Sequence, residues 1–332
     1  MTKKSILNTD WPATELEAVD FCPFCASKNK KSAYENVQDW TFNAAPGKWS
    51  YWDCQDCGAL YLNPRPKKSF IYKAYANYYT HEASNGDLVT SLKLRLKNEI
   101  LSKLYHVNLR PNLKLPQFLS PLVQLLANII YAPYAIHLIA TKSKGNLLDL
   151  GCGGGRILEI AKQYGWQTTG IEIDTEAVNT ANKKGLNVIQ GGYEKLGDFN
   201  NHFDIIYCSH VLEHVYNPKD LLVKAQRALK QNGQFILTLP NAKSFLRATF
   251  GAAWRGLEAP RHLVIPSHIS LIAYMDTIGF NVKADTDKRA FTKNASYQIA
   301  KKNKLAFHLP TLTEACINIE NQDFSFIVAT KV

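Results

Sequence analysis

The pattern of apolar and polar positions changes at Gly145. After it, short apolar runs alternate with stretches that have apolar residues at helical spacing. Such alternation predicts an α/β fold with a doubly wound parallel sheet, whose ligands bind beyond the carboxyl ends of the strands. The predicted strands are 146–150, 167–174, 186–192, 203–209 and 234–241, and the predicted helices are 156–165, 175–185 and 217–233.

The segment before this pattern is less regular. Four tyrosines stand at helical spacing, namely Tyr72, Tyr75, Tyr78 and Tyr79. They indicate either a helix that packs on the core or a tyrosine hydroxyl that faces a substrate. The following run, 118–140, is long and nearly uncharged, but Pro121 and Pro133 interrupt it. A buried cap helix over the active site is the preferred interpretation, with an interfacial helix and a membrane span as alternatives.

Charge is unevenly distributed along the chain. The net charge is +11, and residues 88–145 contain eight Lys/Arg against one acid, Glu99. This block is either a solvated helix face or a contact for nucleic acid, anionic lipid or a phosphorylated substrate. The N-terminus has no apolar signal-peptide region, so we expect a cytoplasmic protein, with peripheral membrane contact through 88–140 as an option.

Four of the seven cysteines form two CxxC pairs, Cys22/Cys25 and Cys54/Cys57. Two such pairs predict a four-cysteine zinc ribbon, because each pair directs two thiolates at one tetrahedral centre. A site closed by four thiolates is structural rather than catalytic. The alternative, a redox CxxC, would need a thioredoxin-like βαβ pattern around one pair, and none is visible.

The first predicted strand ends in a D-x-G-x-G-x-G loop formed by Asp149, Gly151, Gly153 and Gly155. A dinucleotide fingerprint would need glycine or alanine where Arg156 stands, and no Walker lysine is present. The loop resembles motif I of class I S-adenosylmethionine (SAM) methyltransferases. This resemblance implies SAM as cofactor and a Rossmann-like seven-stranded domain, with 280–290 and 323–331 as a final antiparallel pair.

The same resemblance implies roles for residues that follow the later strands. Glu172, at the end of the second strand, would accept the ribose hydroxyls of SAM. Tyr193 and Glu194 would lie at the adenine, and Ser209 would lie near the SAM sulfonium at the end of the fourth strand.

The candidate catalytic residues directly follow that fourth strand. His210, Glu213 and His214 stand at i, i+3 and i+4, on a helical face or the turn leading into it. A histidine there can take a proton from the acceptor, and Glu213 can orient it. A capping and packing role is the alternative. His262, which follows Pro260 at a site common in such enzymes, is a further candidate. Ser267 is the expected N-cap of a helix that ends before Gly279, which would place His268 on the surface of that helix.

Two branches of the superfamily share these marks. In ubiquinone-type O-methyltransferases a related LEHV carries acidic groups that hold a divalent metal, although His210 replaces an acid here. In deoxysugar C-methyltransferases a four-cysteine zinc domain precedes the SAM domain, and a Glu-His pair follows strand four. Both branches imply a small-molecule acceptor.

The sequence therefore predicts a zinc ribbon (1–66), a helical cap (67–145) and a methyltransferase domain (146–332). The expected activity is methylation of a small molecule, with a nucleotide- or lipid-linked sugar as candidate acceptor. The alternatives are an RNA methyltransferase and a non-catalytic SAM-binding or membrane-docking module. Nucleic acid is disfavoured because no RNA-binding motif is present and CSHV replaces the (N/D)-P-P-Y loop of base-amine methyltransferases.

Overall fold

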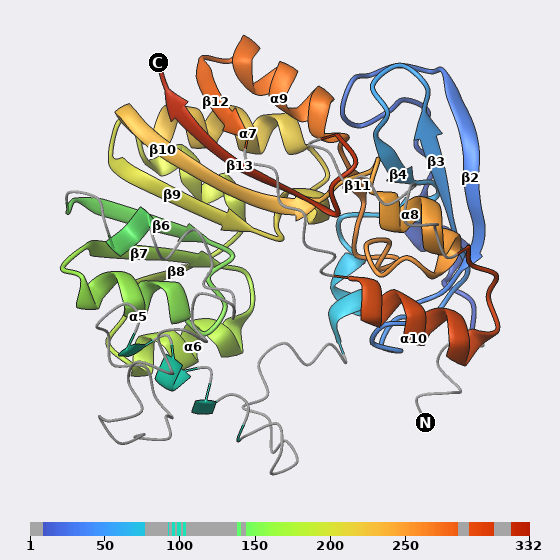
Figure 1. Cartoon of the computed structure of the whole chain (residues 1–332), viewed down its shortest axis with the longest axis horizontal. Coiled ribbons are helices and arrows are strands. Elements are labelled where there is room, and N and C mark those ends of the chain that lie inside the picture. The colour runs from blue at the N-terminus through green and yellow to red at the C-terminus, as the bar shows by residue number, and fades with distance from the viewer. Residues whose placement is uncertain are drawn as a thin grey trace. The chain divides into compact units, whose positions relative to one another are not determined.

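The structure is a computed structural model of the whole chain (Figure 1). It describes residues 9–76, 92, 95–96, 98–100, 102–103, 138–140, 144–284, 292–308 and 320–332. Tyr78, Tyr79 and residues 118–137 lie outside the described residues, as does most of the basic block. Two compact units form: one comprises Met1–Tyr78, Cys208–Arg227 and Gln234–Val332, and the other comprises Tyr79–Tyr207 and Ala228–Gly233.

A mixed seven-stranded sheet confirms the predicted Rossmann-like class, with the strand order β12-β13-β10-β9-β6-β7-β8. Strands β6, β7 and β8 are parallel, as the βαβ alternation predicts. Strands β12 and β13 form the antiparallel pair that the resemblance implied, and β13 also pairs antiparallel with β10. The strands are β6 Asn146–Leu150, β7 Gln167–Glu172, β8 Val188–Gln190, β9 Phe203–Ser209, β10 Leu229–Pro240, β12 Phe280–Ala284 and β13 Phe324–Lys331.

Helices connect these strands close to the predicted positions. Helix α7 ends at Ala228, five residues before the predicted end at Gly233, because β10 already begins at Leu229. Among the described residues, no helix combines the length and apolar character needed to cross a bilayer. The helices of this region are α5 Arg156–Gln163, α6 Thr175–Lys183, α7 Pro218–Ala228 and α9 His268–Thr277, with the 3₁₀ turns η4 Tyr193–Asp198 and η5 Leu212–His214.

A second sheet carries the cysteine pairs and is built from distant parts of the sequence. Its order is β11-β4-β3-β2, so a strand from beyond residue 260 pairs with the N-terminal region. Tyr61 and Leu60 of β4 lie opposite Val264 and Ile265 of β11. The strands are β2 Lys30–Val37, β3 Trp49–Cys54, β4 Leu60–Leu62 and β11 Val264–Ile265; β1 Leu16–Glu17 pairs separately with β5 Arg65–Pro66.

This sheet and the segment 242–265 share one hydrophobic core. Trp49, Tyr51, Phe250 and Trp254 are among its largest buried side chains. The Tyr51 hydroxyl also contacts the carbonyl oxygens of Leu257 (2.6 Å) and His262 (3.0 Å). The remaining elements of this unit are η1 Ala13–Glu15, η2 Ile71–Tyr75, α8 Phe245–Phe250, η6 Gly251–Ala253 and α10 Lys293–Asn303.

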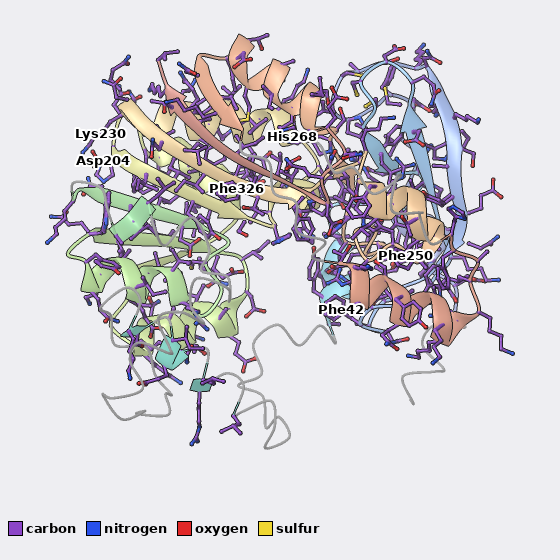
Figure 2. All side chains as sticks on the ribbon, in the orientation of Figure 1. Phe42, Asp204, Lys230, Phe250, His268 and Phe326 are labelled. Atoms are coloured by element: carbon purple, nitrogen blue, oxygen red, sulfur yellow. The ribbon has the colours of Figure 1, made fainter. Side chains whose placement is uncertain are left out.

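A fully buried ion pair joins the same two parts of the chain. Arg261 donates to both carboxylate oxygens of Asp39, at 2.5 and 3.0 Å, and both side chains are inaccessible to solvent. Asp39 also accepts hydrogen bonds from the backbone N–H groups of Phe42, Ala44 and Ala45. Figure 2 labels Phe42, whose ring faces the Arg261 guanidinium at 4.9 Å.

We expect Asp39→Asn to destabilise the protein by about 3 kcal/mol, because it removes the closer of the two carboxylates that compensate the fully buried Arg261 and leaves only Glu258, at 3.2 Å. Urea unfolding monitored by circular dichroism measures this change. Asp56→Asn is the matched control, since Asp56 is an exposed acid of the same unit whose carboxylate accepts hydrogen bonds from Ser27 and Asn29. A loss below about 1 kcal/mol for Asp39→Asn, the range of surface pairs, would contradict the prediction.

Candidate functional site

The loop between β6 and α5 is shaped by glycines. Gly151, Gly153 and Gly155 have φ of 74°, 51° and 82°, which only glycine adopts without cost. A Cβ on Gly155 would lie 2.3 Å from Cδ1 of Leu186. The turn therefore excludes side chains and keeps its backbone open to close approach by a ligand.

Glu172 braces this loop from the end of β7. One of its carboxylate oxygens accepts from the N–H of Gly153 (2.8 Å), and the other accepts from the N–H of Asp174 (2.9 Å). Each carboxylate oxygen can accept a second hydrogen bond, so the group can still bind ribose hydroxyls. Glu172 can therefore hold the loop and still bind the ribose of SAM, as predicted.

The other predicted cofactor residues occupy different environments. Asp149 is buried in β6, and burial, with the charge of Glu172 as a second cause, raises its pKa to about 8. Tyr193 begins η4 and is half-buried, whereas Glu194 in the same turn is exposed. Ser209 ends β9 and is half-buried.

Ile173 is a candidate that the sequence analysis missed. It directly follows Glu172, and 75% of its surface is exposed. An exposed isoleucine beside a carboxylate suited to ribose can cover one face of a purine ring. The available signal was an apolar residue between the two acids of the run GIEID, at the carboxyl end of a predicted strand.

The four predicted zinc ligands come together. The Sγ atoms are 3.7 Å apart in Cys22 and Cys57 and 3.4 Å apart in Cys25 and Cys54, and all four lie within 4.8 Å of one another. Tetrahedral zinc with Zn–S bonds of about 2.3 Å requires Sγ separations of about 3.8 Å. The donors therefore fit a closed zinc site.

The predicted catalytic residues also come together, although they come from two distant segments. After β9 the chain turns at His210, which has φ of 56°, into η5. Glu213 is fully buried, and its Oε1 lies 3.1 Å from Nδ1 of His210 and 3.9 Å from Nε2 of His262. Donor atoms of Glu213, His214 and His262 lie within 4.8 Å of one another, a set that a divalent cation could also use.

Backbone carbonyls orient the buried His262 and the half-buried His214. Nδ1 of His262 lies 2.7 Å from the oxygen of Gly256, and Nδ1 of His214 lies 3.1 Å from the oxygen of Arg261. Their rings meet edge to face, with centroids 4.6 Å apart. The Nε2 atom of His262 is then directed at two carboxylates, Glu213 (3.9 Å) and Glu258 (3.7 Å).

The pKa values of His214 and His262 are lowered, whereas that of His210 is raised. Burial lowers the pKa of His262 to about 4 and also lowers that of His214. Burial acts in the same direction on His210, but the hydrogen bond and charge of Glu213 outweigh it and raise its pKa. At neutral pH, His214 and His262 are therefore neutral imidazoles that can accept a proton.

Further residues join the cluster. The hydroxyl of Tyr75, from η2, lies 3.0 Å from Nδ1 of His214. Tyr75 was one of four tyrosines in the sequence analysis, and spacing alone did not distinguish it. Glu258 and Arg261 were not anticipated: Glu258 pairs with Arg255 and Arg261, and no periodic pattern marks it.

His268 differs from its expectation. We expected His268 on the surface of the helix that Ser267 caps. The cap is confirmed, since Ser267 Oγ accepts from the N–H of Ser270. His268 itself is fully buried, with Nδ1 3.4 Å from the side-chain amide of Gln322 and its backbone N–H bonded to Asn241. Neighbouring segments thus enclose Ser267 and His268, whereas the next residue, Ile269, is exposed.

Buried neutral histidines predict a pH dependence of stability. His262 and His268 have pKa values of about 4 when folded and about 6.5 when unfolded, so unfolding takes up protons below pH 6.5. The free energy of unfolding should fall between about pH 6.5 and 4, by up to about 1.4 kcal/mol per pH unit for each histidine, and be insensitive to them above pH 7. Urea unfolding across this pH range measures the slope of the unfolding free energy against pH. His268→Asn should remove the contribution of one histidine to that slope. Equal slopes for the two proteins would contradict the assignment.

Comparison with known proteins shows the family to which the chain belongs. A family model described as "Methyltransferase domain" matches residues 119–284, half of the chain. The ubiquinone biosynthesis O-methyltransferase of Erwinia tasmaniensis is 31% identical over 142 residues, which are 39% of this chain and 58% of that protein. The enzyme of the same name from Dechloromonas aromatica is 29% identical over 174 residues, 45% of this chain and 74% of that protein.

The match covers little more than half the length of some of these relatives. The chain spans 58% of the Erwinia protein and 54% of its counterpart from Vibrio cholerae. Among solved structures, a SAM-dependent methyltransferase from Archaeoglobus fulgidus is similar at 21% identity and a TM-score of 0.42, over 60% of this chain and 93% of that one.

Proposed function

Because the chain belongs to the class I SAM-dependent methyltransferase family, we propose that it methylates a small-molecule acceptor with the histidine–glutamate cluster as base. The observation that carries this proposal is the meeting of two neutral imidazoles, His214 and His262, beside the buried carboxylate Glu213. Such a group can accept a proton at neutral pH, whereas an exposed histidine would be partly protonated.

The acceptor must lose a proton when it gains a methyl group, and SAM supplies that methyl when bound. His262 is suited to receive the proton at Nε2, because Glu213 and Glu258 on either side stabilise the resulting imidazolium. Tyr75 and the Arg261 carbonyl orient His214 beside it. These residues provide proton transfer and alignment, which are the protein's share of the reaction.

The cofactor is assigned to the glycine loop and the residues after β7 and β8. Gly151, Gly153 and Gly155 would give backbone contacts to the amino-acid end of SAM, and Glu172 would hold the ribose. Ile173 and Tyr193 would line the adenine, with Asp149, Glu194 and Ser209 as further predicted contacts. The four cysteines would hold a structural zinc.

Our proposal for the acceptor class rests on the family resemblance and on the relatives' names. A nucleotide- or lipid-linked sugar is our candidate, which the zinc ribbon and the Glu-His pair support. The relatives named for ubiquinone biosynthesis favour a lipid-bearing acceptor, methylated on oxygen. Carbon and oxygen acceptors both need a base in the same place.

A label-transfer assay tests the proposal. Purified protein is incubated with methyl-labelled SAM and a lysate of the source organism, and the products are partitioned between organic solvent and water. Label in the organic phase supports a lipid-linked acceptor, and label in small water-soluble molecules supports a free nucleotide sugar. No transferred label, with SAM still bound, would refute the enzymatic function and leave a binding module.

A further inference from the structure

The outer face of α10 carries a group of side chains that methyl transfer does not use. Residues 292–308 contain four lysines and no acid. Lys293, Tyr297 and Lys301 follow each other at i, i+4 and i+8, and therefore lie along one stripe of the helix. We call the following exposed residues the α10 patch: Lys293, Tyr297, Lys301, Lys302, Lys304 and Phe307.

The two aromatic rings of the α10 patch, Tyr297 and Phe307, are held in place by packing against each other and against Phe250. Phe307 stacks on Phe250, with centroids 5.6 Å apart and an interplanar angle of 27°, and Tyr297 meets Phe307 edge to face at 5.7 Å. Figure 2 labels Phe250, which lies in the core, fully buried. Tyr297 and Phe307 nevertheless keep 39% and 37% of their surface exposed. They form a fixed apolar ridge among the lysines.

The opposite face of α10 packs against the protein interior. Ser296, Ile299 and Ala300 are buried, and the Ser296 hydroxyl accepts from the N–H of Arg255. The helix therefore cannot turn its lysines inward. Within the described part of the chain, these lysines form no ion pair, so their positive charge is available to a partner.

We propose that the α10 patch docks on an anionic lipid surface. Lysines attract the negative headgroups, while aromatic rings enter the boundary between headgroups and acyl chains. Single-stranded RNA would also be attracted by the lysines, but its bases need a free ring face for stacking. Phe307 is already stacked on Phe250, and Tyr297 and Phe307 meet edge to face, so each ring already uses part of its stacking surface, which favours a lipid surface.

The proposal is independent of the methyl-transfer assignment and is tested without an acceptor. The full-length protein is sedimented with vesicles of pure phosphatidylcholine and with vesicles containing 30% phosphatidylglycerol. We expect binding to the anionic vesicles only. The partition coefficient should fall by about 25-fold for Lys301→Ala/Lys302→Ala, since each lysine contributes about fivefold. Lys183→Ala/Lys195→Ala, two exposed lysines of the other unit, is the matched control and should bind normally.

A second variant separates the rings from the charge. Tyr297→Ser leaves the charge unchanged and should still weaken binding severalfold. The proposal is overturned if the unmodified protein ignores anionic vesicles, or if the control loses as much binding as the patch variant. It is also overturned if a single-stranded RNA oligonucleotide binds the patch and displaces the vesicles.

Discussion

Glu213→Gln is expected to lower methyl transfer by about 10²–10⁴-fold, the usual contribution of a positioned acid–base group. The exchange keeps the size of the side chain but removes the charge that faces Nε2 of His262 at 3.9 Å and Nδ1 of His210 at 3.1 Å. An imidazolium formed at His262 then has Glu258 as its remaining carboxylate neighbour. The rate is measured with saturating labelled SAM and a fractionated lysate that supports transfer.

Two controls show whether this loss is chemical. SAM affinity, measured by calorimetry, should stay within about twofold, because Glu213 is assigned no contact with the cofactor. His268→Asn, which changes a buried histidine outside the cluster, should retain most of the activity. If Glu213→Gln transfers methyl groups at the original rate, the cluster is a packing feature and the base lies elsewhere.

Removing zinc is expected to have the largest effect on stability. Structural zinc contributes about 10–16 kcal/mol of apparent binding energy in isolated zinc-finger peptides, and most of that is folding free energy. Here the loss should be smaller, because Trp49, Tyr51 and their neighbours form a core of their own. We still expect Cys54→Ser to lower the urea midpoint strongly and to remove one zinc per chain, measured by elemental mass spectrometry.

Cys208→Ala is the comparison for that experiment. Cys208 is fully buried in the strand β9 but lies outside the four-cysteine cluster, so its replacement should leave the zinc content unchanged. A purified protein that contains no zinc, or a Cys54→Ser variant as stable as Cys208→Ala, would refute the structural zinc assignment.

The sequence predicted those features that depend on local pattern. The strands after Gly145 follow from continuous apolar runs bounded by turns, and the cysteine cluster follows from two CxxC spacings. His210, Glu213 and His214 could be grouped as candidates from the sequence because one short turn carries all three.

Features that depend on contacts between distant segments could not be predicted in the same way. The pairing of β11 with β4 involves two-residue and three-residue strands, which are too short to give a periodic signal. Tyr75 became distinct from the neighbouring tyrosines only through its contact with His214, 139 positions away. His268 was misplaced because capping rules locate the start of a helix but not the segments that enclose it.

The late arrival of β11 has a consequence for synthesis on the ribosome. Strand β4 emerges early, but its partner is made about 200 residues later, which takes on the order of 10–40 s at ordinary elongation rates. Until then the backbone of β4 is an unpaired edge on that side, open to pairing with other nascent chains. Slow stretches of translation between residues 66 and 264 would prolong that exposure, so codon choice in this interval should influence the yield of native protein.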